Sequence, residues 1–336
     1  MNSSRHRAGR FTAAFRARYL QSLHDYRFFY DDISEIGNPA TADYIFYFVP
    51  GINGTPGQTR FVLPSLTRVF GSQVYMKALH LPEFSARRPV WEKYTPANVD
   101  RKLEQLRTDL SELLQRHEHV TVIASSNGFY DFAAAAGNLS SDEVARIHLV
   151  WGACAPDHFD PTPWEQVFFP LNGFEHEGHR WFAFPNHNLF QAFNPEASHT
   201  HLWRDGPQSR RFVKADLESR FHFAGLEWDY VSVSQIGAMV HHVVNQIGGP
   251  VRIPAEALVA ANDGYWQGKP PAVVERHIRR YLPDANIEFK PASHLWVVTP
   301  SHVTELFERL KHRLHGMSGA HAISRPQASI PVLAGV

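Results

Sequence analysis

The chain has 336 residues, of which 43% are hydrophobic and 20% charged, so its length suits one large domain with an insertion or two modest domains. Its 33 basic residues balance 33 acidic ones, which indicates no basic surface for nucleic acid or an anionic membrane. No apolar run approaches the ~18–20 residues that span a bilayer, and the basic N-terminus lacks the apolar core of a secretory signal.

Apolar periodicity predicts strands and helices that alternate along the chain. Strands are expected at 26–33, 44–49, 74–81, 119–124, 147–151, 257–261 and 286–289, and helices at 61–70, 96–117, 129–137, 237–249, 271–281 and 301–315. The clearest helix is 96–117, where five leucines fall on one stripe. Alternation of this kind indicates a mainly parallel sheet that is covered by helices on both faces.

The regular rhythm stops in the middle of the chain. Residues 156–234 are rich in Phe, Trp, His, Pro and Asn, which predicts a cap or lid inserted at the carboxyl edge of the sheet. The expected organisation is therefore an N-terminal helical extension (1–25), an α/β core (26–155 and 235–315), the cap (156–234) and a loosely ordered tail (316–336).

A tight turn is expected after the buried strand 119–124. A serine at such a strand-to-helix turn projects its hydroxyl above the sheet, and the residues two before and two after it must be small. Ala124 and Gly128 meet this requirement around Ser126, whereas Ser125 would be flanked by Ile123 and Asn127. Sterics therefore select Ser126 as the nucleophile, although Ser and Asn at this place also suit an ordinary helix N-cap.

In this stretch, Ala124-Ser125-Ser126-Asn127-Gly128, the sequence resembles the G-x-S-x-G motif of the α/β-hydrolase superfamily, with Ala in the first small position. The resemblance covers roughly 26–315 and implies an eight-stranded sheet with a cap after the sixth strand. It also implies that the backbone N–H groups of Ile52 and Asn127 form the oxyanion hole. The loop that holds Ile52, 48–54, has Pro50 where relatives often have His, and an ordinary turn is its alternative interpretation.

The chain order in this superfamily is serine, acid, histidine. By that order Asp263 would be the acid and His294 the base, since each follows an expected strand. Turn chemistry alone could account for Asp263, and Asp157, after the strand that ends near residue 151, is kept as the alternative acid. Asp131 is expected to face solvent or to cap a neighbouring element, and Glu256 to precede its strand at the wrong end of the sheet.

The insertion holds many aromatic residues and histidines. His199 and His201 have a ligand-like spacing, and Glu175, His176 and His179 form a second group, but no HExxH motif supports a metal site. The single cysteine, Cys154, excludes an intramolecular disulfide and a cysteine metal cage, and a reducing cytoplasm is expected. We therefore expect neither a metal nor another cofactor.

These residues favour a serine hydrolase that cleaves a carboxylic ester through an acyl-enzyme. The aromatic cap favours an apolar acyl or aryl small-molecule substrate, with no nucleic-acid partner and with a homodimer left open. The same triad would serve a thioesterase, lactonase, C–C hydrolase or acyltransferase. The alternative of another class is a non-catalytic, hydrolase-like binding protein.

Overall fold

The computed structural model describes residues 34–158, 163–185, 228–290 and 300–322, except 53, 55, 57–58, 86–87, 262 and 267–268; Ala13, Arg16, Ala17, Leu20 and His294 are described singly. The strand expected at 26–33, most of the N-terminal extension and much of the expected cap therefore lie outside the described residues. So do residues 323–336 of the tail.

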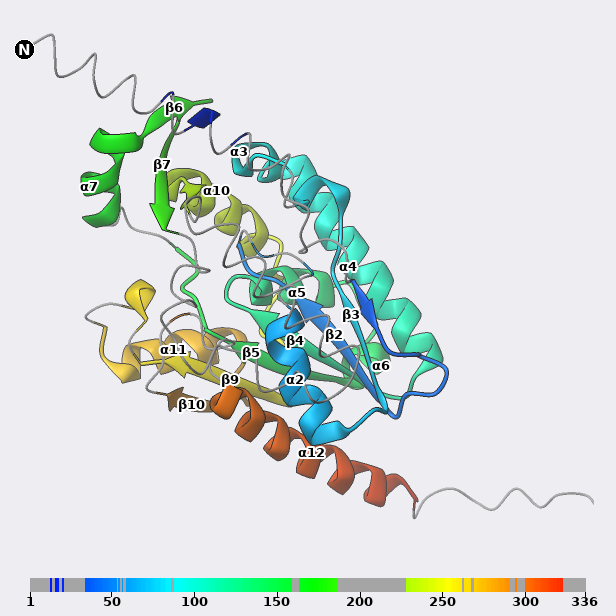
Figure 1. Ribbon diagram of the computed structural model, residues 1–336. Coiled ribbons are helices and arrows are strands. Elements are labelled where there is room, and N and C mark those ends of the chain that lie inside the picture. Colours follow the sequence, from blue (N-terminus) through cyan, green and yellow to red (C-terminus); the bar gives the residue numbers. More distant parts are fainter. Residues whose placement is uncertain are drawn as a thin grey trace, which may run out of the picture.

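A seven-stranded sheet forms the centre of the molecule (Figure 1). Its order is β1-β3-β2-β4-β5-β9-β10, and every neighbouring pair except β1–β3 is parallel. The strands are β1 (Glu35–Ile36), β2 (Tyr44–Val49), β3 (Val74–Ala78), β4 (Val120–Ser125), β5 (Ile147–Gly152), β9 (Ala255–Ala260) and β10 (Asn286–Lys290). The expectation of a mostly parallel α/β sheet is confirmed. Eight strands are not found, because the described residues contribute seven to this sheet.

Side chains alternate between the two faces of the sheet, as the period of a strand requires. In β2, Ile45, Tyr47 and Val49 enter one core, whereas Phe46 and Phe48 enter the other. The first core is closed by α4 (Pro96–Arg116), α5 (Gly128–Ala136), α10 (Val233–Val244) and α11 (Pro271–Tyr281), and the second by α2 (Thr59–Phe70) and α12 (Pro300–Ala322). Both faces are thus covered, which explains why the strands read as continuous apolar runs.

Helix α4 shows how local sequence sets an element. Thr95 caps its N-terminus by accepting a hydrogen bond from the Asn98 N–H, and Pro96 occupies the first turn, where its missing N–H costs nothing. The leucine stripe is buried from Leu103 to Leu114. Polar residues such as Glu104 remain exposed, so the helix packs by one face only.

The remaining described elements are short. Between β3 and α4 lie η2 (Pro82–Phe84) and α3 (Val90–Lys93), and between α5 and β5 lies α6 (Ser141–Val144), whose Ser140 and Glu143 form a capping box. The part of the insertion that is described contains α7 (Pro163–Asn172) and an antiparallel sheet of β6 (Phe174–His176), β7 (His179–Pro185) and β8 (Trp228–Val231). Trp181 and Tyr230 of this sheet are buried with Trp91 of α3. The insertion follows β5, the fifth strand that is described, where the resemblance implied the sixth.

The last helix is longer than its sequence pattern suggested. α12 continues beyond His315 to Ala322, so the segment 316–322 is helical and not part of a loose tail. Met317 is the one large apolar residue between Gly316 and Ala322, so this segment has no apolar stripe that would predict a helix. No described helix combines the length and the apolarity needed to cross a bilayer.

Candidate active site

The side chains selected from the sequence follow the carboxyl ends of four parallel strands. The Pro50–Gly51 loop follows β2, Ser126 follows β4, Asp263 comes after β9, and His294 after β10. Parallel strands bring these ends to a single edge, where sites in open α/β sheets form. Topology therefore gathers residues that are up to 244 positions apart, from Pro50 to His294.

The turn at Ser126 is tight and left-handed. Its φ of 53° lies in a region that residues with a Cβ rarely adopt. The Ser126 N–H donates to the Gly152 carbonyl at 2.8 Å, and the Trp151 indole N–H donates to the Ser126 carbonyl at 2.9 Å. Contacts from β5 and the residue at its end thus hold this uncommon conformation in place.

Two glycines let the loop after β2 approach the turn closely. A Cβ on Gly51 would lie 2.9 Å from Ser126 Cβ, and a Cβ on Gly128 would lie 2.6 Å from the Val49 carbonyl oxygen and 2.7 Å from that of Pro50. Side chains do not tolerate such distances. Gly128, two positions after Ser126, must therefore be small because the loop that carries Ile52 lies directly against it.

Three side chains at this edge form a chain of hydrogen bonds. His294 Nε2 lies 2.8 Å from Ser126 Oγ, and His294 Nδ1 lies 2.6 Å from Asp263 Oδ2. The Asp263 side chain is fully buried, and its Oδ1 accepts the Tyr265 N–H at 2.9 Å. Because the carboxylate only accepts, it favours the proton on Nδ1, which leaves Nε2 to accept from the Ser126 hydroxyl. The Tyr265 ring packs edge-on against the imidazole, with ring centroids 4.6 Å apart.

Within the described part of the chain, several hydrogen-bond donors near the Ser126 turn have no acceptor. Among the described residues, the backbone N–H groups of Ile52 and Asn127 donate to nothing, and the buried Asn127 Nδ2 has no partner. Asn127 Oδ1 lies 3.3 Å from Ser126 Oγ, but the hydroxyl has one proton and the 2.8 Å contact with His294 is the shorter. Free donors at a helix N-terminus next to a hydroxyl are what a developing oxyanion needs.

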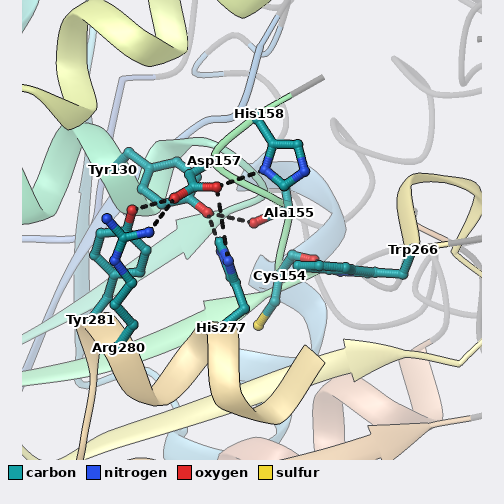
Figure 2. Close-up of polar contacts among 9 residues, drawn as sticks. All are labelled: Tyr130, Cys154, Ala155, Asp157, His158, Trp266, His277, Arg280 and Tyr281. Atoms are coloured by element: carbon teal, nitrogen blue, oxygen red, sulfur yellow. Dashed lines mark hydrogen bonds and ion pairs between the residues drawn. The ribbon is translucent and has the colours of Figure 1, made fainter. Parts of the chain in front are cut away.

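The alternative acid, Asp157, is held elsewhere. Four side chains surround its carboxylate, as Figure 2 shows: Tyr281 at 2.6 Å, Arg280 at 3.3 Å, His158 at 2.9 Å and His277 at 3.8 Å. Burial would raise the pKa of Asp157, but the hydrogen bonds from His158 and Tyr281, together with the charges of His277 and His158, outweigh it and lower the pKa below its ordinary value. The structure brings His294 against Asp263 and does not bring it against Asp157.

Trp266 ties the turn after β9 to the end of β5. In η5 (Gly264–Trp266), the Trp266 N–H donates to the Asp263 carbonyl at 3.1 Å, and its indole N–H donates to the Cys154 carbonyl at 2.5 Å (Figure 2). The next carbonyl, Ala155, accepts the Tyr130 hydroxyl at 2.6 Å. Trp266 has no role among the residues predicted from the sequence. The one sequence feature that points to it is its position three residues after the expected acid, Asp263.

Two other carboxylates differ from expectation. Asp131 does not face solvent: it is buried and pairs with the ammonium of Lys102 on α4. Its place on the helix behind Ser126 suggested exposure, but α4 packs directly on that helix. Glu256 does not precede its strand but lies within β9, where Asn286 and Arg313 contact it at 2.7 Å and 2.8 Å. It still belongs to the amino-terminal half of β9, at the opposite end from Asp263.

The histidines of the insertion are only partly described. His179 Nδ1 lies 3.0 Å from the Ser234 hydroxyl, and His176 packs against Trp91 with ring centroids 6.1 Å apart. His199 and His201 lie outside the described residues. Within the described part of the chain, no three His, Cys, Asp or Glu side chains are grouped so as to hold a metal ion.

The mostly parallel sheet, the strand–Ser126–helix turn and the chain order serine, acid, histidine are the arrangement of the α/β-hydrolase fold. No protein-family model matches the chain, and no curated protein is significantly similar to it. The fold is therefore assigned from topology and from the geometry of the turn.

Solved structures similar to this chain include esterases, lipases and thioesterase domains. A carboxylesterase of Nitrososphaera gargenis is 16% identical, with 85% of this chain and 94% of that chain covered and a TM-score of 0.44. A monoacylglycerol lipase of Paleococcus ferrophilus is 16% identical, with 82% and 94% covered and a TM-score of 0.43. The NocB thioesterase domain, in covalent complex with a fluorophosphonate nocardicin G analogue, is 17% identical, with 83% and 99% covered and a TM-score of 0.44.

Proposed function

We propose that this chain is a serine hydrolase that cleaves a carboxylic ester through an acyl-enzyme intermediate. The observation that carries the proposal is the hydrogen-bonded chain from Ser126 through His294 to Asp263, at 2.8 Å and 2.6 Å. A serine hydroxyl is a poor nucleophile at neutral pH, and an imidazole held in one tautomer by a buried carboxylate is the arrangement that activates it.

In the proposed reaction, Ser126 Oγ attacks the ester carbonyl carbon while its proton passes to His294 Nε2. The carbonyl oxygen becomes an oxyanion, which the N–H groups of Ile52 and Asn127 stabilise. The C–O bond to the alcohol then breaks, and the proton on His294 goes to the departing alkoxide. Water attacks the acyl-enzyme in the same way, with His294 as base, and releases the acid and the free Ser126 hydroxyl.

The expectation of an apolar acyl or aryl group rests on the aromatic residues of the insertion. A hollow adjoins the loop after β2 and is lined in part by Leu79, Leu81 and Phe84, but its free volume of about 10 Å³ holds about one water molecule and not a substrate group. A thioester, lactone, C–C or acyl-transfer substrate would use the same residues, so a screen of p-nitrophenyl esters beside acyl-CoA thioesters is required to separate these reactions.

Covalent labelling tests the proposal directly. A fluorophosphonate probe should label the wild-type protein and Ser125→Ala but not Ser126→Ala. Hydrolysis of p-nitrophenyl esters should fall in Ser126→Ala by about 10⁴–10⁶, the usual cost of removing a catalytic nucleophile, while Ser125→Ala keeps most of it. If folded wild-type protein neither reacts with the probe nor turns over any ester, the non-catalytic binding protein becomes the better interpretation.

A further inference from the structure

The side chain of Asn127 stands where an asparagine usually caps a helix, but it does not cap. Asn127 is the N-cap residue of α5, and its side chain makes no hydrogen bond to the backbone of the first turn. Its polar contact within the described part of the chain is with the nucleophile instead, since Asn127 Oδ1 lies 3.3 Å from Ser126 Oγ. The ordinary capping role that the sequence allowed is therefore not the role of this side chain.

The Nδ2 group of Asn127 is a buried donor. The residue is 7% exposed, and among the described residues Nδ2 has no hydrogen-bond acceptor. A buried donor without an acceptor destabilises a fold, whereas an alanine at this position would leave no such donor. A group of this kind beside a nucleophile is explained if its acceptor appears only during the reaction.

The proton count at Ser126 shows which end of the amide suits the reacting oxygen. The hydroxyl has one proton, and the 2.8 Å contact with His294 Nε2 takes it. Ser126 Oγ and Asn127 Oδ1 are then two acceptors that face each other at 3.3 Å. Half a turn of the amide about its last bond exchanges Oδ1 and Nδ2 within nearly the same space, because that torsion is close to two-fold. An N–H donor then lies against Oγ.

Negative charge develops on Ser126 Oγ twice in the proposed reaction. It develops first as the proton passes to His294 and the oxygen attacks the ester carbonyl, and again when the C–Oγ bond of the acyl-enzyme breaks. A hydrogen bond to a charged oxygen is about twice as strong as one between neutral groups. The amide therefore stabilises the charged oxygen more than the resting hydroxyl, which is the condition for lowering a barrier.

We propose that Asn127 is a further catalytic residue, whose side-chain amide donates Nδ2–H to Ser126 Oγ while that oxygen carries negative charge. This inference rests on the proposed ester hydrolysis and adds a group that contacts the reacting atom. It is separate from the oxyanion donor proposed for the same residue, because that donor is the backbone N–H, which remains when the side chain is replaced by alanine or aspartate.

Asn127→Ala removes the amide and keeps the backbone N–H. Its kcat and kcat/KM for p-nitrophenyl butyrate should each fall by about 10–100-fold, the factor expected of a hydrogen bond to a charged group, so KM changes little. The rate constant of fluorophosphonate labelling should fall as well, since Oγ also attacks phosphorus, but labelling should still reach completion. The urea midpoint should equal or exceed that of wild type, because the variant lacks the unpaired donor.

Two further variants keep the test decisive. Asn127→Asp has the shape of asparagine, but its carboxylate only accepts and would repel a charged Oγ, so kcat/KM should fall at least as far as in Asn127→Ala. Asn138→Ala is the matched control, because Asn138 Nδ2 donates to the Ala134 carbonyl at 3.3 Å near the other end of α5. Its removal should leave kcat/KM unchanged.

Three results would overturn the proposal. They are a folded Asn127→Ala that hydrolyses the ester at the wild-type rate, a folded Asn127→Asp that keeps the wild-type kcat/KM, which would assign the amide an accepting role, and a lowered urea midpoint or loss of folding in both variants, which would assign the amide to the fold. In each case fluorophosphonate labelling of Ser126 in the wild type would still support the ester hydrolase, so the Asn127 side chain alone would lose its role. A wild-type protein that neither reacts with the probe nor cleaves any ester would refute both proposals.

Discussion

Gly128→Ala is the substitution that tests the contact between the Ser126 turn and the loop after β2, which we propose supplies an oxyanion donor. The new Cβ would lie 2.6 Å from the Val49 carbonyl oxygen and 2.7 Å from that of Pro50, whereas ordinary van der Waals contact begins at about 3.4 Å. The loop and helix α5 must therefore separate by about 0.8 Å. Both neighbours are backbone atoms that belong to β2 and its loop, so no side-chain rotation relieves the contact.

The displacement should affect turnover more than folding. Ile52 is two residues beyond Pro50, and a shift approaching 1 Å in a group that contacts the reacting atoms can cost about 10² in rate. Overpacking costs about 1–3 kcal/mol of stability, from which the gain of replacing a helical glycine is subtracted. We expect kcat for p-nitrophenyl butyrate to fall about 100-fold, while urea unfolding gives a stability within about 2 kcal/mol of wild type.

Gly137→Ala is the matched control at the other end of the same helix. Its φ of −60° suits alanine, and its added Cβ would come no closer than 3.5 Å to another atom. This variant should keep the wild-type kcat. If Gly128→Ala is folded and turns over at the wild-type rate, the loop after β2 does not supply an oxyanion donor from its observed position, and that part of the proposed mechanism is wrong.

Three further outcomes are expected. Asp263→Asn should lower kcat/KM by about 10⁴, because an amide no longer holds His294 in the required tautomer, and Asp157→Asn should cost far less; the reverse ranking would move the acid to the earlier strand. Burial lowers the pKa of His148 in β5 to about 4, below its ordinary 6.5 in the unfolded chain, so the unfolded chain binds more protons between these values. The free energy of unfolding is therefore unaffected by His148 above pH 6.5 and falls by up to about 3 kcal/mol as the pH drops toward 4. In urea unfolding, the stability of His148→Asn should depend less on pH over this range. An unchanged pH dependence would assign the acid sensitivity to other groups. Trp266→Phe should cost about 1–3 kcal/mol, since it leaves a buried carbonyl beyond β5 without its donor, and should lower kcat by loosening the turn that carries the acid; an unchanged kcat would show that this hydrogen bond serves stability alone.

Much of the core could be predicted from the sequence because local periodicity reports burial directly. The leucine stripe of α4 and the apolar runs of β2, β4 and β5 occur where they were expected, and α11 has the expected bounds, Pro271–Tyr281. Local sterics also pointed to Ser126, since the left-handed turn there needs a small residue at Gly128. These features depend on residues close in the chain, which a sequence displays.

Only the tertiary structure decided which distant side chains meet. Asp263 and Asp157 both follow strands, and from the sequence Asp263 was preferred as the acid only by the chain order of the superfamily. In the structure, residues of α11 bind the Asp157 carboxylate. The pairing of β9 with β10 brings His294 toward Asp263 instead. The pairing of Asp131 with Lys102 could not be predicted, because a helix pattern allows exposure or a capping contact and does not show which neighbour covers the side chain. The extension of α12 to Ala322 and the role of Trp266 likewise depend on contacts or on residues without a periodic signal. Short-range pattern specifies which elements form and which face each buries, whereas the pairing of polar groups across elements is set by packing, which a single sequence does not encode in any local spacing.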